Sequence, residues 1–357
     1  MNPKYQVLAE ALRAGILSGT YRKTLPTEQA LCGQFRVSRQ TVRQALSLLE
    51  TEGLIERRQG SGSFIREQRE PAAQPHRSVA VVTTYISDYI FPSILREIEA
   101  VCSENNSAPL LFATQNQVSN ERRILQTLLT MDHLDGILIE GTKTGLPNPN
   151  VTLCRQLTEK GIPMIFFHGN YEQLPGTLSV LDDNAAGARM LVEYLVQNGH
   201  RDIGGIFKYD DIQGRQRFEG YLEGLREFDI PPEDGSVIWY STDTKDRFLR
   251  DDYTAERLRN MLSACSAVVC YNDEIALRVV SCLAGMGRSV PEDLSVVSFD
   301  NSHYSEITTP RITSLSHGRY NVGRMAAETL FRVLRGEPCV SQLAPWTLVE
   351  KESCKKR

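Results

Sequence analysis

The sequence contains no apolar run that approaches the roughly 20 residues needed to cross a bilayer, and its N-terminus has no apolar signal core. These absences argue against a membrane-spanning or exported protein and indicate a cytoplasmic one. Eight cysteines are present, but they form no CxxC pair and have no nearby histidine that would complete a zinc pattern. We therefore expect no metal or cofactor, and we interpret most of the cysteines as buried apolar side chains.

The chain also lacks an overall basic charge, which by itself argues against a nucleic-acid binder. It has 40 Lys and Arg against 44 Asp and Glu, a formal net charge of −4. The charges are unevenly distributed, because residues 1–70 hold 11 basic against 7 acidic side chains and the remainder holds 29 against 37. A length of 357 residues with 41% hydrophobic content predicts two or three domains. The basic domain is the short N-terminal one.

A helix-turn-helix pattern lies within residues 25–48. Thr27 is a hydroxyl N-cap for a first helix that ends near Phe35, and Ser38 can cap a second helix. The second helix has apolar residues at i, i+3, i+4 and i+7, which are Val42, Ala45, Leu46 and Leu49. This stripe faces a core and leaves polar side chains facing outward, which are Arg39, Gln40 and Arg43.

The segments around this pattern complete a small domain. Residues 5–17 predict an N-terminal helix with Leu8, Leu12 and Ile16 on one face, and Gly53 is suited to end the second helix of the motif. Residues 54–58 and 63–66 alternate as two strands about the turn 59–62, which predicts a β-hairpin wing. Outward basic residues on a helix are often only a solvated surface. The order helix, turn, helix, glycine and glycine-rich hairpin instead favours a winged helix-turn-helix that binds DNA.

Residues 1–70 resemble the GntR family of bacterial transcription factors. The resemblance implies that the first turns of the second helix contact base edges and phosphates in the major groove, and that the wing tip contacts the minor groove or the backbone. Lys4, at the start of the first helix, either reaches a phosphate or belongs to a frayed basic terminus. The expected DNA-binding residues are Lys4, Arg36, Ser38, Arg39, Gln40, Thr41, Arg43, Gln59, Gly60 and Ser61.

Beyond residue 66 the composition and the apolar pattern of the sequence change. Residues 67–77 are polar, contain two prolines and carry no apolar period, so they predict a linker between a domain of residues 1–66 and a second domain of residues 78–357. From residue 78 short apolar strands alternate with amphipathic helices. This alternation predicts parallel sheets covered on both faces, in a series long enough for an α/β domain of two lobes.

Ligands of such sheets bind at the carboxyl ends of the strands, and this chain is unusually polar there. Glu140, His168, Asp182 and Lys208 each follow a predicted strand, and Asn272, Asp300 and His317 are further polar residues that come later in the chain. Carboxylates, amides and an arginine that converge in a cleft suit a polyhydroxyl sugar, whose hydroxyls both donate and accept. An aspartate at a strand end is often a helix N-cap instead, and we expect that role for Asp183 and Asp273. Asp300, Arg217 and Asn272 are better candidates for ligand contacts.

The same stretches resemble the effector domains of LacI/GalR regulators, which are related to periplasmic sugar-binding proteins. The resemblance spans roughly residues 78–350 and includes the segments 182–187, 195–201, 213–221, 270–277 and 290–300. Matched position by position, it implies an effector site of Phe91, Glu140, Lys143, His168, Asp182, Lys208, Gln213, Arg217, Asn272, Asp300 and His317. His168 and His317 differ from the residues that the family most often has, which leaves the identity of the sugar open.

A GntR-type domain joined to a LacI-type domain is an unusual pairing, and it resembles the arabinose-responsive repressors. The resemblance implies a cytoplasmic homodimer that binds operator DNA, represses genes for arabinose use and leaves the DNA when L-arabinose binds. The alternative is the same architecture with another sugar, a sugar phosphate or a nucleoside as effector. The carboxylates in the cleft also suggest a sugar-active enzyme, but the matched positions are binding positions, so we expect no catalytic residues.

Overall fold

The structure, a computed structural model of the chain, describes residues 3–17, 20–21, 23–58, 62–65, 77–250 and 252–357. The chain divides into two compact units, residues 1–75 and residues 76–357. The expected linker lies outside the described residues except for Arg77, which begins the first strand of the second unit. In the described ranges, no helix is long and apolar enough to cross a membrane.

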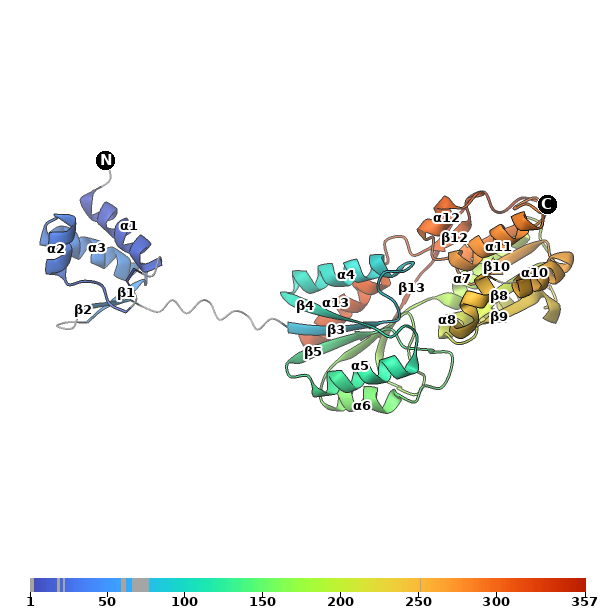
Figure 1. Cartoon of the computed structure of the whole chain (residues 1–357), viewed down its shortest axis with the longest axis horizontal. Helices are drawn as coiled ribbons and strands as arrows, with labels where there is room; N and C mark the ends of the chain where they lie inside the picture. The colour runs from blue at the N-terminus through green and yellow to red at the C-terminus, as the bar shows by residue number, and fades with distance from the viewer. Residues whose placement is uncertain (1–2, 18–19, 22, 59–61, 66–76, 251) are drawn as a thin grey trace. The chain divides into compact units, whose positions relative to one another are not determined.

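The N-terminal unit is the predicted winged helix-turn-helix. Its elements, in blue in Figure 1, are α1 (Lys4–Leu17), α2 (Glu28–Phe35), α3 (Arg39–Thr51), β1 (Ile55–Arg58) and β2 (Gly62–Ile65). Both predicted caps are confirmed, because the hydroxyl of Thr27 accepts from the amide of Ala30 at 3.3 Å and that of Ser38 from the amide of Thr41 at 3.2 Å. Gly53 has a φ of 74°, which lets the chain turn out of α3 into the hairpin.

The core of this unit lies where α1 and α3 cross. Val42, Ala45, Leu46 and Leu49 of α3 are all at most 1% exposed, which confirms the predicted stripe. Leu8 and Leu12 of α1 and Leu31 of α2 pack against them. Strands β1 and β2 pair antiparallel, as expected for a wing. Burying one face of α3 in this way leaves its other face exposed.

The C-terminal unit has two lobes, each built on a six-stranded sheet (Figure 1). The strand order of the first lobe is β13-β7-β6-β5-β3-β4 and that of the second is β14-β12-β11-β10-β8-β9. The strands are β3 (Arg77–Thr83), β4 (Ser107–Ala113), β5 (Leu134–Ile139), β6 (Met164–Phe167), β7 (Leu178–Asp182), β8 (Ile203–Lys208), β9 (Val237–Tyr240), β10 (Ala267–Cys270), β11 (Ser295–Phe299), β12 (Thr313–Ser316), β13 (Gln342–Ala344) and β14 (Thr347–Val349). Neighbouring strands are parallel except β12 and β14, which are antiparallel and depart from the predicted all-parallel sheets.

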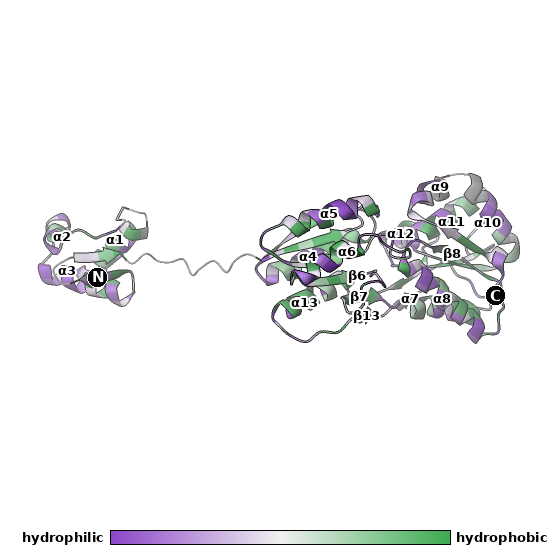
Figure 2. Cartoon of the chain, turned by 90° about the horizontal axis from the view of Figure 1, so that it is seen from below, coloured by the Kyte–Doolittle hydropathy of each residue, from purple (hydrophilic) through white to green (hydrophobic). Residues whose placement is uncertain are grey.

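Helices cover both faces of each sheet. They are α4 (Phe91–Glu104), α5 (Val118–Thr130), α6 (Val151–Glu159), α7 (Asn184–Gln197), α8 (Ile212–Glu227), α9 (Lys245–Arg250), α10 (Asp252–Ala264), α11 (Asp273–Gly285), α12 (His303–Ile307) and α13 (Val322–Leu334), with short 3₁₀ turns at Asp234–Ser236 and Thr242–Thr244. In the first lobe α4 and α13 pack on one face and α5 and α6 on the other; in the second lobe α10 and α11 lie opposite α7 and α8. Figure 2 shows hydrophilic residues on the outer surfaces of helices such as α5 and α8.

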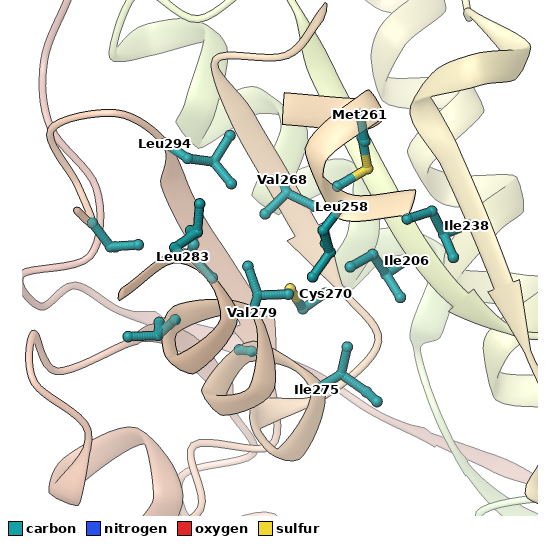
Figure 3. Packing of buried hydrophobic residues seen from close by; sticks show 14 of the residues in the cluster. Ile206, Ile238, Leu258, Met261, Val268, Cys270, Ile275, Val279, Leu283 and Leu294 are labelled. Carbon is teal, nitrogen blue, oxygen red and sulfur yellow. The ribbon is translucent and has the colours of Figure 1, made fainter. Parts of the chain in front are cut away.

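One of the four cores of this unit is drawn in Figure 3. Ile275, Val279 and Leu283 of α11 point toward Val268 and Cys270 of β10. All five side chains are fully buried. Four of the eight cysteines are buried and the other four are partly exposed, so the prediction that most are buried is only half right. Rigid cores of this kind hold the strand ends in fixed positions.

The chain passes between the lobes three times. The first crossing follows β7, the second follows β12 and the third joins β13 to β14. The amide of Asp183 donates to the carbonyl of Ala344 at 3.1 Å, so the first and third crossings lie side by side. These three segments form the hinge, and the polar strand ends of both lobes open toward the cleft above it.

Candidate functional site

The N-terminal unit exposes a set of basic side chains at the start of α3. Lys4, Arg36, Ser38, Arg39, Gln40 and Arg43 are exposed and Thr41 is half-buried. The wing-tip residues Gln59, Gly60 and Ser61 lie outside the described residues. Ser38 uses its hydroxyl to cap α3, and it also lies 2.9 Å from the hydroxyl of Thr41. The helix therefore begins with ordered amides and hydroxyls, which is an arrangement that attracts phosphate.

A carboxylate gathers the arginines of this surface. Glu28, in the first turn of α2, accepts from Arg39 at 3.0 Å, from Arg43 at 3.1 Å and from Arg57 of the wing at 3.1 Å. Hydrogen bonding to Arg39 is the main cause that lowers the pKa of Glu28. The arginines stay accessible, since the side chains of Arg39 and Arg43 are 73% and 59% exposed. The sequence did not predict this position of Glu28 between three arginines.

In the C-terminal unit, the cleft between the lobes is a cavity of about 1140 Å³. The predicted effector residues line it with the exception of Lys143, whose amine instead pairs with Asp243 across the cleft mouth at 2.7 Å. Phe91 enters the lining from the first turn of α4, and its ring contacts Tyr85 edge to face. The expectation that cleft residues lie at the carboxyl ends of strands is confirmed for Glu140, His168 and Asp300, because each directly follows a buried strand.

Arg217 of α8 is at the centre of the cleft and is 3% exposed. Its guanidinium donates to the side chain of Asn184 at 2.9 Å, to the carbonyl of Tyr271 and to Asp300 at 3.4 Å. It also stacks on the ring of Phe299, with 4.1 Å to the ring centroid. Burial disfavours the charge, but Asp300, Tyr271 and Asp182 together outweigh burial and raise the pKa of Arg217. A buried cation held this way can present a fixed donor surface to a ligand.

Tyr89, which sequence analysis did not select, reaches across the cleft. It lies in the loop after β3 with a φ of 55°, and its hydroxyl donates to Asp300 at 2.7 Å. The same oxygen accepts from the amide of Asp273 at 3.2 Å. Burial raises the pKa of Tyr89, which keeps the phenol protonated. The lobes are therefore joined directly on this side of the cavity.

The opposite side of the cleft is joined by the segment after β5. The hydroxyl of Thr144 accepts from the amide of Ile212 at 3.0 Å, and the amide of Gly145 donates to the carbonyl of Asp210 at 3.0 Å. Glu121, which is fully buried, holds this segment from beneath through Asn148 at 2.9 Å and Asn150 at 2.8 Å. With contacts on both sides, the lobes are in a closed arrangement.

Two further acidic and basic groups face the cavity. Glu140 accepts from the amide and the hydroxyl of Thr84 at 2.7 and 2.6 Å, and burial raises its pKa. Lys208 pairs with Asp210 and with Asp211 at 2.5 Å, and although burial opposes its charge, Asp211 raises its pKa. Gln213 is buried, and its side-chain oxygen has no partner among the described residues. The cavity thus offers carboxylates and an amide oxygen as acceptors.

The two predicted helix caps had different outcomes. Asp183 caps α7 by accepting from the amide of Ala186 at 3.3 Å, as expected. Asp273 is not a cap, because Asn272 takes that role and accepts from the amide of Ile275 at 3.1 Å. The carboxylate of Asp273 is instead buried among serine hydroxyls and the amide of Ser302. Burial raises the pKa of Asp273 to about 6. Asn272, selected as a ligand contact, therefore lines the cavity and caps a helix at once.

Two histidines flank Asp182 at the hinge. His168 Nδ1 lies 2.9 Å from one carboxylate oxygen of Asp182, and His317 Nε2 lies 2.7 Å from the other. His317 stacks on Trp346, with 3.6 Å between ring centroids, and its Nδ1 lies 3.2 Å from the carbonyl of Pro345. Burial alone lowers the pKa of His168, but Asp182 raises it to about 9. His168 and His317 together hold the pKa of Asp182 well below its usual range.

Comparison with protein families assigns both units. Residues 4–65 match the bacterial regulatory proteins of the gntR family, and residues 192–354 match a periplasmic binding protein-like domain. The chain is 33% identical over 347 residues to an arabinose metabolism transcriptional repressor of Halalkalibacterium halodurans, covering 94% of this chain and 91% of that protein. A repressor of the same description from Geobacillus stearothermophilus is also 33% identical, over 93% of this chain and 91% of the relative.

Solved structures agree on the fold. The transcription regulator CcpA of Lactococcus lactis superposes with a TM-score of 0.68 at 23% identity, over 78% of this chain and all of that one. The transcriptional regulator CelR in complex with cellobiose gives a TM-score of 0.66 at 24% identity, over 89% of this chain and 91% of that one. At this level of identity the likeness establishes the two-lobed architecture alone.

Proposed function

Since the chain belongs to the family of the arabinose metabolism transcriptional repressors, we propose that it represses transcription from operator DNA and is released when L-arabinose enters the cleft. It is a transcriptional regulator and not an enzyme. The observation that carries the proposal is one-third identity along 94% of the chain, which includes both the DNA-binding unit and the residues of the cleft. As a bacterial repressor it would act in the cytoplasm, where the DNA is.

The DNA-binding unit supplies the contacts with the operator. Arg36, Arg39 and Arg43 would bind phosphates or guanine edges, while Ser38, Gln40 and Thr41 would bind phosphates or base edges. Lys4 would add a phosphate contact, and the wing tip at Gln59–Ser61 would contact the backbone or the minor groove. We further propose a homodimer that reads two half-sites. Leu111 on the edge strand β4 and Trp239 on the edge strand β9 are 46% and 36% exposed, and they suit a surface between two copies.

The cleft supplies the contacts with the sugar. Glu140, Asp300 and Gln213 would accept hydrogen bonds from sugar hydroxyls, and Arg217, Lys208 and Asn272 would donate. Phe91 would cover an apolar face of the ring. Lys143 would act by holding the cleft mouth closed through Asp243, since its amine is engaged there. Closure around the sugar would favour a dimer arrangement in which the two DNA-binding units no longer match the operator.

Release requires the sugar to bind the operator-free form more tightly than the operator-bound form. A preference of roughly 100-fold corresponds to about 2.7 kcal/mol of coupling, which is within the usual range. Such coupling is reciprocal, so operator DNA must weaken sugar binding by the same factor.

The test is a titration of DNA complexes with sugars. Fragments recovered from the genome by the purified protein would serve as labelled probes for fluorescence anisotropy, and L-arabinose, D-xylose, D-galactose, D-ribose and a sugar phosphate would be added in turn. We expect release by L-arabinose alone, with micromolar binding in calorimetry. Release by another of these compounds would show that L-arabinose is not the effector, while the assignment as a repressor would stand. Equal sugar affinity with and without operator DNA would overturn the coupling.

A further inference from the structure

His168 carries a ring nitrogen that has no hydrogen-bond partner in the described part of the chain. The residue is 6% exposed and lines the cavity, and among the described residues its Nε2 has no hydrogen-bond partner. Its other ring nitrogen is engaged with Asp182 at 2.9 Å. Buried polar atoms are nearly always partnered in folded proteins, so an unpartnered one that faces a ligand cavity indicates the place of a ligand atom.

The surroundings of His168 decide whether Nε2 donates or accepts. Asp182 accepts from Nδ1, which fixes a proton on that nitrogen, so Nε2 donates only when the ring carries both protons. Glu140, directly after β5, and Asp300, directly after β11, add negative charge, and Arg217 of α8 is the cation that pairs with Asp300. Burial lowers the pKa of His168, but Asp182 raises it to about 9. At neutral pH both nitrogens therefore carry protons, and Nε2 is a donor.

The chemistry of the partner follows from the same neighbours. An anionic ligand group at Nε2 would lie beside Asp182, Asp300 and Glu140, and repulsion would disfavour it. A sugar hydroxyl can bind any of the acceptors in the cleft, because it carries a proton. The ring oxygen of a sugar has no proton and can only accept. It needs a donor, and His168 Nε2 is a buried nitrogen of the cavity lining that has no hydrogen-bond partner among the described residues.

We propose that His168 Nε2 donates a hydrogen bond to the ring oxygen of the bound sugar, with Asp182 and His317 as positioning residues. Asp182 holds the imidazole in place, and His317 Nε2 lies 2.7 Å from the second oxygen of that carboxylate. The proposal rests on the proposed function, because it assigns one atom of the sugar to one atom of the cleft.

The first experiment compares two ligands by calorimetry at pH 7. They are L-arabinose and its carbocyclic analogue, in which a methylene group replaces the ring oxygen. A charge-assisted hydrogen bond lost without replacement should weaken binding about 10- to 100-fold. In His168→Leu, the two ligands should bind with equal affinity. His303→Leu is the matched control, since His303 is an exposed histidine of the cavity lining, and it should keep the wild-type ratio. Equal binding of both ligands to the wild-type protein would overturn the proposal.

The second experiment follows the histidine itself in the full chain without a ligand. Imidazole nitrogen resonances would be recorded by NMR from pH 6 to pH 10, with the His168 signal assigned by its loss in His168→Gln. We expect the doubly protonated ring to persist to about pH 9. The midpoint should fall in Asp182→Asn, and it should rise in His317→Asn because His168 then no longer shares the Asp182 carboxylate. A purely structural role of His317 would leave the midpoint unchanged. A midpoint near 6.5 in the wild-type protein would overturn the proposal.

The two experiments separate this inference from the proposed function. If neither ligand binds, L-arabinose is not the effector and the assignment of its ring oxygen falls with it. If L-arabinose binds but the analogue binds equally well, the effector stands and the role of His168 is wrong.

Discussion

The two units of this repressor each gather arginine and carboxylate groups, but the cluster of one unit is exposed to solvent and the cluster of the other is buried. In the DNA-binding unit, Glu28 binds arginines that remain largely exposed, with Arg39 at 73% and Arg43 at 59%. In the cleft, the side chain of Arg217 is 4% exposed and that of Asp300 is 8% exposed. The same chemical pair is thus placed in water in one unit and out of water in the other.

Exposure decides what each cluster can do. Exposed ion pairs contribute between zero and about 1 kcal/mol to folding, because water and salt screen them. Arg39 and Arg43 can therefore exchange Glu28 for phosphate or a base edge at little cost. Removing one partner of a buried pair costs about 3 to 5 kcal/mol, because the remaining charge is stranded. Arg217 and Asp300 are therefore fixed in place, and a ligand must fit them.

Loss of the buried arginine should have the largest effect. Arg217→Ala removes the cation that pairs with Asp300 and the donor to the Asn184 side chain, and we expect sugar affinity to fall at least about 100-fold. Operator binding should persist while the response to L-arabinose disappears. Calorimetry and anisotropy measure the two effects, and Arg189→Ala on α7, whose guanidinium pairs with Glu227 at the surface, is the control. Normal sugar affinity in Arg217→Ala would show that the buried cluster does not hold the ligand.

Loss of an exposed arginine should weaken operator binding and leave sugar binding intact. Arg43→Ala should weaken operator binding about 10- to 100-fold and leave sugar affinity unchanged, because a base or phosphate contact is lost without any buried charge being stranded. Anisotropy at several salt concentrations would measure it. Arg13→Ala is the matched control, since Arg13 is also paired in the same unit, with Glu52 at 2.7 Å, away from the start of α3. Operator binding of Arg43→Ala equal to wild type at physiological salt would refute the assignment of α3 as recognition helix.

Alkaline pH should lower the stability of the cleft domain. His168 has a pKa raised from 6.5 to about 9, so its stabilising contribution is complete below about pH 6.5 and is lost as the pH rises through 9. We expect the cleft domain to lose up to about 3 kcal/mol between pH 7 and pH 10, since one unit of pKa shift corresponds to about 1.4 kcal/mol. Both tryptophans, Trp239 and Trp346, lie in this domain, so fluorescence-detected unfolding reports on it. His168→Gln should flatten the pH dependence.

The smallest effect on folding is expected from Glu28→Gln. The exposed cluster contributes little to stability, so the free energy of unfolding should change by less than about 1 kcal/mol. The three arginines would lose the carboxylate that holds them together. Binding to non-specific DNA should therefore strengthen several-fold, and the ratio of operator to non-specific affinity should fall. Competition with random-sequence DNA measures that ratio. A large loss of stability would show that Glu28 is a structural group and the two clusters are alike.

The features that sequence predicted well are those decided by near neighbours. Ser38 caps α3 through an amide three residues away, and the stripe from Val42 to Leu49 lies on one helix, so spacing alone specifies both. The strands β5 and β6 were visible as short apolar runs. β12 was missed because its sequence, Thr-Ser-Leu-Ser, is mostly polar, although three of its four residues are buried.

Features that depend on distant partners could not be read in this way. Asp273 was expected to cap its own helix, but its hydroxyl partners are Ser298 and Ser314, which are 25 and 41 residues away. Tyr89 and Asp300 are 211 residues apart, and no periodicity connects them. Lys143 was selected as an effector contact from its local segment, whereas its partner Asp243 is 100 residues distant. The sequence predicted which residues line the cleft, but it did not predict which of their side chains contact each other.

The hinge segments lie next to the site proposed for the sugar. Asp182, His317 and Pro345 belong to the three crossing segments, and they are tied to each other and, through His168, to the floor of the cleft. A ligand that contacts His168 would bind close to the three segments that connect the lobes. A small displacement there becomes a wide arc at the outer edges of the lobes, where β4 and β9 lie. The effector would therefore bind beside the hinge, where a few hydrogen bonds can cause a large movement of the distant parts of the lobes.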